Sequence, residues 1–184
     1  MSNTILVTYA SRLGATAGVA EAIGKTLTDN GAQVEVRRME EVTDLTPYSA
    51  VVAGSAIRGK QWLPEAMQFM RTHQAALRQK PFAAFLVCMT LATLAPTAWA
   101  QCGVKDGEKY RPQVAAWLDP VRSLVKPVSE GLFAGVLDIG QISSFSDRLK
   151  FRVSVLVGVW QEGDHRDWNA IREWAARLRA VLLP

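Results

Sequence analysis

The sequence has few of the residues that build disulfide frameworks or metal centres. Its 184 residues include two cysteines and two histidines. Cys88 and Cys102 lie far outside C-x-x-C spacing, and His73 and His165 cannot complete a usual zinc site with them. We therefore expect buried or idle thiols and no metal site.

The chain also lacks the usual signals for secretion or membrane insertion. Its first four residues carry no basic segment, and an apolar run begins at once at Ile5. The uncharged stretch 82–104 is long enough to span a bilayer, but Thr90, Pro96 and Gln101 interrupt it, and its first part suits a buried strand. We expect a cytoplasmic protein, with peripheral contact to the inner face of a membrane as an alternative.

The overall composition is that of an ordinary globular protein. Hydrophobic residues make up 49% and charged residues 21% of the chain, so we expect one domain over residues 1–184. The net charge is +4 and the pI is about 9.3. This basic balance suggests an acidic partner, an anionic substrate or a membrane surface, with scattered solvated arginines as the alternative explanation, and we expect no nucleic-acid partner.

Residues 4–23 combine an apolar run, a turn of small residues and an amphipathic segment. Val19, Ile23 and Leu27 recur every four residues, as on one face of a helix. The turn before them would direct backbone N–H groups and the positive end of the helix dipole at one point, with hydroxyls from Ser11 and Thr16 beside them. This arrangement predicts a phosphate site.

Glycine spacing excludes two common kinds of phosphate loop. A dinucleotide site needs G-x-G-x-x-G, but this turn has Gly14 as its only glycine before Gly18. A Walker loop needs four residues between its first glycine and G-K-[ST], whereas five separate Gly18 from Gly24.

The same turn resembles the phosphate loop of the flavodoxin-like FMN proteins. The matching positions are Tyr9, Ser11, Gly14, Thr16, Ala20 and Ile23. Thr8 departs from the usual aliphatic residue, and Arg12 adds a cation that ordinary flavodoxins lack. With this arginine, the loop is similar to that of the menaquinone-dependent protoporphyrinogen IX dehydrogenases.

The resemblance implies an α/β fold with a doubly wound, five-stranded parallel sheet in the order 2-1-3-4-5. We expect strands near residues 4, 33, 50, 82 and 132–138. Helices are expected from Pro64 and from Tyr110, the latter broken at Pro120, and a final helix is expected to start at Asp164 or Asp167.

The resemblance also implies FMN as cofactor, bound at the carboxyl ends of strands one, three and four. The implied contacts are Ser11, Arg12, Leu13, Gly14, Ala15 and Thr16 for the phosphate, and Ser55, Ala56, Ile57, Arg58, Gly59, Trp62, Met89, Thr90 and Leu91 for the ring. Ile57 and Trp62 are candidate ring faces, although Trp62 could equally pack on the following helix. Gly59 is a candidate for tuning the flavin, because a glycine peptide reorients at little steric cost.

Residues 148–160 fit two secondary structures. Alternating apolar residues from Phe151 to Val159 favour a strand, whereas Leu149, Val153, Leu156 and Trp160 recur as in a helix. The resemblance to the dehydrogenases, which have an amphipathic basic segment here, favours the helix.

Two functions remain open after the sequence is read. One is an oxidoreductase that oxidises protoporphyrinogen IX and passes electrons to a quinone, with Arg58, Arg148, Lys150 and Arg152 as candidate carboxylate contacts. The other is an electron-transfer carrier between partner proteins, with no small-molecule substrate and a link to oxidative stress.

Overall fold

A parallel sheet forms the centre of the protein. The computed structural model describes residues 3–93, 107–142 and 144–183. The sheet strands are β1 (Thr4–Ala10), β2 (Gln33–Arg38), β3 (Tyr48–Arg58), β5 (Phe82–Cys88) and β6 (Ser129–Ala134). Their order is β2-β1-β3-β5-β6, so the predicted order 2-1-3-4-5 is confirmed.

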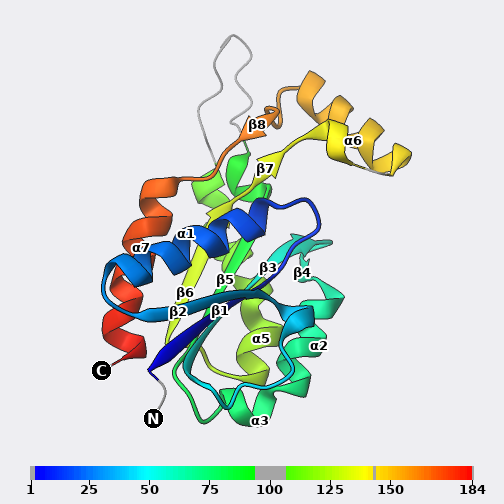
Figure 1. Ribbon diagram of the computed structural model, residues 1–184. Helices are drawn as coiled ribbons and strands as arrows, with labels where there is room; N and C mark the ends of the chain where they lie inside the picture. The colour runs from blue at the N-terminus through cyan, green and yellow to red at the C-terminus, as the bar shows by residue number, and fades with distance from the viewer. Residues whose placement is uncertain (1–2, 94–106, 143, 184) are drawn as a thin grey trace.

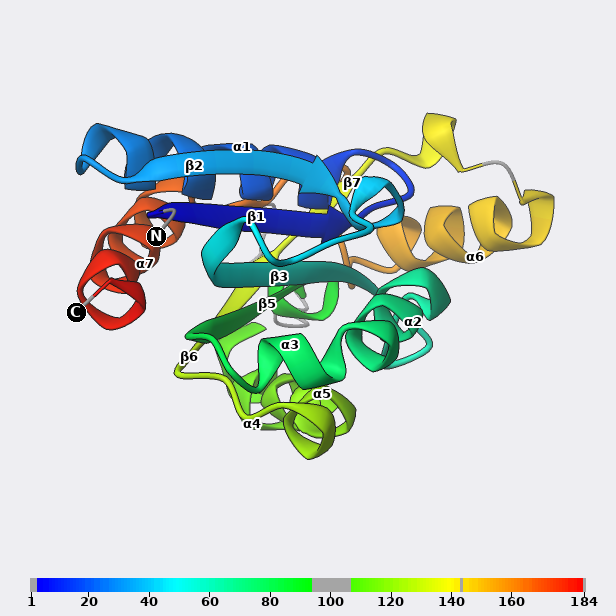
Figure 2. The same ribbon diagram turned by 60° about the horizontal axis from the view of Figure 1, so that its bottom comes forward.

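Helices cover both faces of this sheet (Figures 1 and 2). One face carries α1 (Ala15–Asp29) and α7 (Trp168–Leu182); the other carries α2 (Pro64–Thr72), α3 (Gln74–Leu77), α4 (Arg111–Ala115) and α5 (Asp119–Leu124). Ile5 and Val7 of β1 pack toward α1 and α7, while Leu6 and Ala10 pack toward the other layer. Because both faces are covered, the central strands are apolar along their length.

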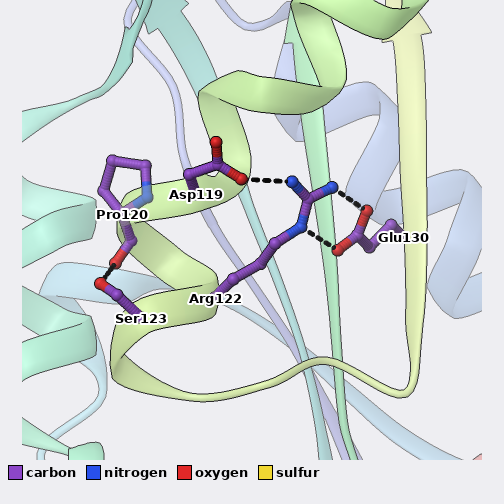
Figure 3. A network of polar contacts seen from close by, with 5 residues as sticks. All are labelled: Asp119, Pro120, Arg122, Ser123 and Glu130. Atoms are coloured by element: carbon purple, nitrogen blue, oxygen red, sulfur yellow. Dashed lines mark hydrogen bonds and ion pairs between the residues drawn. The ribbon is translucent and has the colours of Figure 1, made fainter.

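The break predicted at Pro120 is present between α4 and α5, where a 3₁₀ turn separates the two helices. Arg122 of α5 then ties this layer to the edge strand β6. Its guanidinium donates to both oxygens of Glu130, at 2.7 and 2.6 Å, and also to Asp119 at 2.5 Å (Figure 3). The paired geometry is the stronger form of an arginine–carboxylate contact.

The fifth strand differs from the prediction of one strand over 132–138. Strand β6 ends at Ala134, which pairs with Cys88, the last residue of β5. Beyond that pair the neighbouring strand offers no further backbone partner. After Gly135 the chain continues as β7 (Val136–Leu137), which instead pairs antiparallel with β8 (Gly163–Asp164).

The segment between β7 and β8 contains a helix, α6 (Phe145–Leu156), as the resemblance favoured. It stands beyond the end of the sheet, apart from both helical layers (Figures 1 and 2), and none of its residues is fully buried. In the ranges that the structure describes, no helix is long and apolar enough to cross a membrane.

Candidate functional site

A cavity of about 620 Å³ lies at the carboxyl ends of the parallel strands. Open α/β sheets bind their ligands at this edge, and the volume is within the range of small-molecule sites. The predicted residues that line it are Ser11, Arg12, Leu13, Ala15, Thr16, Ala56, Ile57, Arg58 and Met89. The structure therefore brings together residues from the segments after β1, at the end of β3 and after β5.

One end of the cavity is the turn that leads from β1 into α1. Gly14 is the N-cap of α1 with φ +83°, a left-handed conformation that favours glycine. Its N–H donates to Ser11 Oγ at 3.2 Å, which closes the turn. Among the described residues, no side chain caps the first turn of α1, so the helix N-terminus keeps backbone donors for a ligand.

Thr16 provides the test of whether this end of the cavity fits a phosphate. Its side chain is 1% exposed, and its Oγ1 has no hydrogen-bond partner among the described residues. A buried hydroxyl without a partner is costly, and a phosphate oxygen at the helix N-terminus would satisfy it. The residues present therefore fit an FMN phosphate at this position.

The predicted loop after the third strand is a tight hairpin. Strand β3 continues to Arg58 and pairs with β4 (Gln61–Trp62). Gly59 and Lys60 form the turn between them, with φ of +59° and +66°. Two positive φ values in a two-residue turn match the twist of a hairpin, which explains why the chain reverses here without a longer loop.

Two of the predicted ring contacts, Ser55 and Trp62, lie inside the protein. Ser55 Oγ accepts a hydrogen bond from the Leu63 N–H at 3.0 Å and donates to the Ala56 carbonyl at 2.8 Å. Trp62 is 4% exposed and packs in the core beside Leu63 and Phe69. Neither residue is among those that line the cavity.

The segment after β5 contributes mainly through the end of the strand. Met89 lines the cavity, as do Val87 and Cys88, whereas Thr90 and Leu91 form a 3₁₀ turn away from its lining. Cys88 is buried, as predicted, and burial raises the pKa of its thiol. The second cysteine, Cys102, lies outside the described residues.

Sequence reasoning missed the fourth wall of the cavity. This wall comes from the β7–β8 pair, which we call the ribbon, and from the α6 segment. Its lining residues are 135–138, at the start of the ribbon, and Ser144, Asp147 and Phe151. The only signal for this wall was that residues 135–138 form the carboxyl end of the predicted fifth strand. Within this wall, the Asp138 carboxylate accepts a hydrogen bond from the Gly140 N–H at 3.0 Å and caps the 3₁₀ turn that follows.

Arginines gather around this cavity, but some have partners within the protein. Arg12, Arg38 and Arg58 line it, and Arg58 Nη2 lies 3.1 Å from Asp147 Oδ2 of α6. Arg148 donates twice to the Ile142 carbonyl. Neither Arg148, Lys150 nor Arg152 is among the lining residues.

Comparison with known proteins agrees with this architecture. A family model described as Flavodoxin domain matches residues 6–159, and a search of curated proteins found no match. The chain is similar to a solved short-chain flavodoxin associated with a bacterial microcompartment, at 15% identity over 98% of this chain and 99% of that chain, with a TM-score of 0.57.

Two further solved structures show the same fold. The Streptococcus pneumoniae TIGR4 flavodoxin is 16% identical over 96% of this chain and 98% of its own, with a TM-score of 0.57. The two-electron reduced flavodoxin of Megasphaera elsdenii is 13% identical over 94% and 98%, with a TM-score of 0.53.

Proposed function

The chain belongs to the flavodoxin domain family, and from this premise we propose that FMN occupies the cavity and that the protein uses it to transfer electrons. FMN is the cofactor of the family, and the chain is a redox protein of this FMN type. Bound FMN supplies hydride and single-electron chemistry, while the protein positions and tunes it. The observation that carries the assignment is the buried hydroxyl of Thr16 at the N-terminus of α1, which has no hydrogen-bond partner in the part of the chain that the structure describes.

The cavity divides into a phosphate end and a ring end. At the phosphate end, the backbone of residues 11–16 and the Thr16 hydroxyl would donate to the phosphate, and the Arg12 guanidinium would add a charge-assisted bond. At the ring end, Ile57 and Met89 offer apolar surface. Gly59 lies in the adjacent hairpin turn, where it would adjust its peptide to the protonation of the ring.

Thr16→Ala tests the phosphate end. The variant loses a hydrogen bond to a charged group, so FMN affinity should fall roughly ten- to a hundredfold. Thr26→Ala is the matched control, because Thr26 lies on the same helix and its hydroxyl already donates to the Ala22 carbonyl. Fluorescence titration with FMN gives both dissociation constants. Equal FMN affinities in the two variants would contradict the placement of the phosphate at Thr16.

For the reaction, we propose protoporphyrinogen IX as the electron donor and a quinone as the acceptor. Support comes from Arg38 and Arg58 at the cavity, which suit the carboxylates of a porphyrinogen, and from the basic net charge. The competing function is electron transfer between proteins, and it is favoured by the Arg58–Asp147 and Arg38–Glu40 pairs, which already engage both arginines.

Anaerobic assays separate these two functions. Protoporphyrinogen IX is supplied with a menaquinone analogue, and porphyrin fluorescence is followed with FMN-loaded protein or with free FMN. Faster porphyrin formation with the protein supports the dehydrogenase. No gain over free FMN, together with rapid reduction by a flavodoxin reductase, supports the carrier.

We also propose that the outward face of α6 contacts an anionic membrane surface, where a quinone would be available. Phe145, Leu149 and Leu156 are 79%, 54% and 85% exposed, and Lys150 and Arg152 are exposed on the same helix. An apolar stripe with basic neighbours is typical of helices that lie in a lipid interface. Co-sedimentation with vesicles of anionic or neutral lipid tests this, with Leu149→Ser/Leu156→Ser as the variant that should lose binding.

A further inference from the structure

Helix α6 has one face toward the cavity and another toward solvent. Ser144, Asp147 and Phe151 line the cavity and are spaced by three and four residues, as on one side of a helix. Phe145, Leu149, Val153 and Leu156 are exposed and follow the same spacing. The helix therefore serves as a wall of the cavity even though it does not pack on the sheet.

Contacts from two sides hold this wall in place. The Arg58–Asp147 ion pair, at 3.1 Å, joins α6 to the end of β3. Phe151 packs against the Trp160 ring, with centroids 5.3 Å apart and planes at 33°. Trp160 Nε1 in turn donates to Thr93 Oγ1 at 3.2 Å, which links this aromatic pair to the segment after β5.

Phe151, rather than Trp62, presents an aromatic side chain to the cavity. A flat ring such as a flavin needs an apolar or aromatic face to lie against. Trp62 lies in the core, whereas Phe151 is half-buried and is the one aromatic side chain among the described residues that line the cavity.

We propose that Phe151 is the aromatic contact for the cofactor ring, held in position by Trp160 and by the Arg58–Asp147 pair. This inference rests on the proposed binding of FMN. It adds to the site a contact that lies outside the loops at the ends of β1, β3 and β5. Phe151 packs at the ring end and excludes water there, while its neighbours limit the movement of α6.

Phe151→Ala and Phe145→Ala form a matched test. Both remove a phenyl group from α6, but Phe145 is 79% exposed and is absent from the cavity lining. We expect Phe151→Ala to weaken FMN binding about tenfold, in line with the loss of an aromatic contact. Phe145→Ala should leave the affinity unchanged. Phe151→Tyr should keep the affinity and lower the fluorescence of bound flavin, because a phenol in contact with a flavin quenches it by electron transfer.

The outcomes of this test distinguish a contact from Phe151, a contact from Trp62 and a failure to bind FMN. If Phe151→Ala binds FMN with unchanged affinity and Phe151→Tyr leaves the fluorescence of bound flavin unchanged, the inference is overturned while FMN binding stands. If Trp62→Phe alters bound-flavin fluorescence and Phe151→Tyr and Phe151→Ala do not, the contact belongs to Trp62. If the wild-type protein fails to bind FMN, the proposed function falls as well. Circular dichroism of each variant confirms that α6 and the body are folded.

Discussion

Helices α6 and α7 both have apolar residues at helical spacing, but they use them differently. In α7, Ile171, Trp174 and Leu178 are buried against the sheet beside α1. In α6, Leu149 and Leu156 remain exposed. The difference follows from their connections, since α7 returns along the sheet while α6 stands on the β7–β8 ribbon beyond the strand ends (Figure 1). An apolar stripe therefore stabilises the fold only where the chain path brings it onto another apolar surface.

Leucine substitutions in the two helices should give the largest contrast. Leu178 is fully buried, so Leu178→Ala should lower the free energy of unfolding by about 2–5 kcal/mol. Leu156→Ala makes the same chemical change at a side chain that is 85% exposed and should stay within about 0.5 kcal/mol of wild type. Urea unfolding of both variants measures the difference. Similar losses would mean that α6 packs on the body in solution.

Removing the N-cap side chains of α7 and α6 should again affect stability more in α7 than in α6, by a smaller amount. Asp167 Oδ1 accepts from the N–H groups of Asn169 and Ala170, both at 3.0 Å, and Asp167→Ala should cost about 1 kcal/mol. Ser144 Oγ accepts from the Asp147 N–H at 3.4 Å. Ser144→Ala should leave global unfolding unchanged and increase amide hydrogen exchange in α6 alone. A uniform increase in exchange across the protein would contradict this local effect.

Two ion pairs, Arg122–Glu130 and Arg58–Asp147, can be compared in the same way. Glu130→Gln removes the charge from the two-bond contact with Arg122 that fastens α5 to β6 (Figure 3). It should lower the free energy of unfolding by about 0.5–1 kcal/mol. Asp147→Asn breaks the single contact with Arg58, whose side chain is 63% exposed, and should leave thermal unfolding unchanged. If Asp147→Asn lowered the stability more than Glu130→Gln, the Arg58–Asp147 pair would be the stronger of the two.

The smallest expected effect is the pH dependence of the ribbon. Arg166 donates to both carboxylate oxygens of Asp164 in β8, and this hydrogen bonding lowers the pKa of Asp164. Because the pKa is lower in the folded protein, the ionised Asp164 contributes to the free energy of unfolding. This contribution is complete above the pKa of the unfolded state, about 3.9, and is lost as the pH falls through the pKa of the folded state. Asp164→Asn should therefore have a lower free energy of unfolding than wild type at pH 6, and the two values should converge near pH 2. A difference that persists at pH 2 would point to lost hydrogen bonds rather than lost charge.

Much of the fold and the phosphate end of the site could be predicted from local patterns. The turn from Ser11 to Thr16 was identified because its spacing and the helix after it are local features, and Gly14 does take the left-handed cap. The ring end was harder to predict. Ser55 and Trp62 are close in sequence to the cavity residues Ala56 and Ile57, but the hairpin directs them into the core.

The sequence by itself determined where the first four strands lie, the turn from Ser11 to Thr16 and the helix caps, because periodicity, glycine positions and capping residues act over a few residues. The strand order followed from the resemblance to the flavodoxin-like proteins. Only the tertiary structure decided where the fifth strand stops and which wall closes the cavity. Strand β6 ends where its partner β5 ends, and a short ribbon then carries α6 over the strand ends. Phe151 reaches the cavity through that path, and neither its spacing nor its neighbours in the chain indicate it. Long-range pairing places such residues, so local patterns cannot identify them.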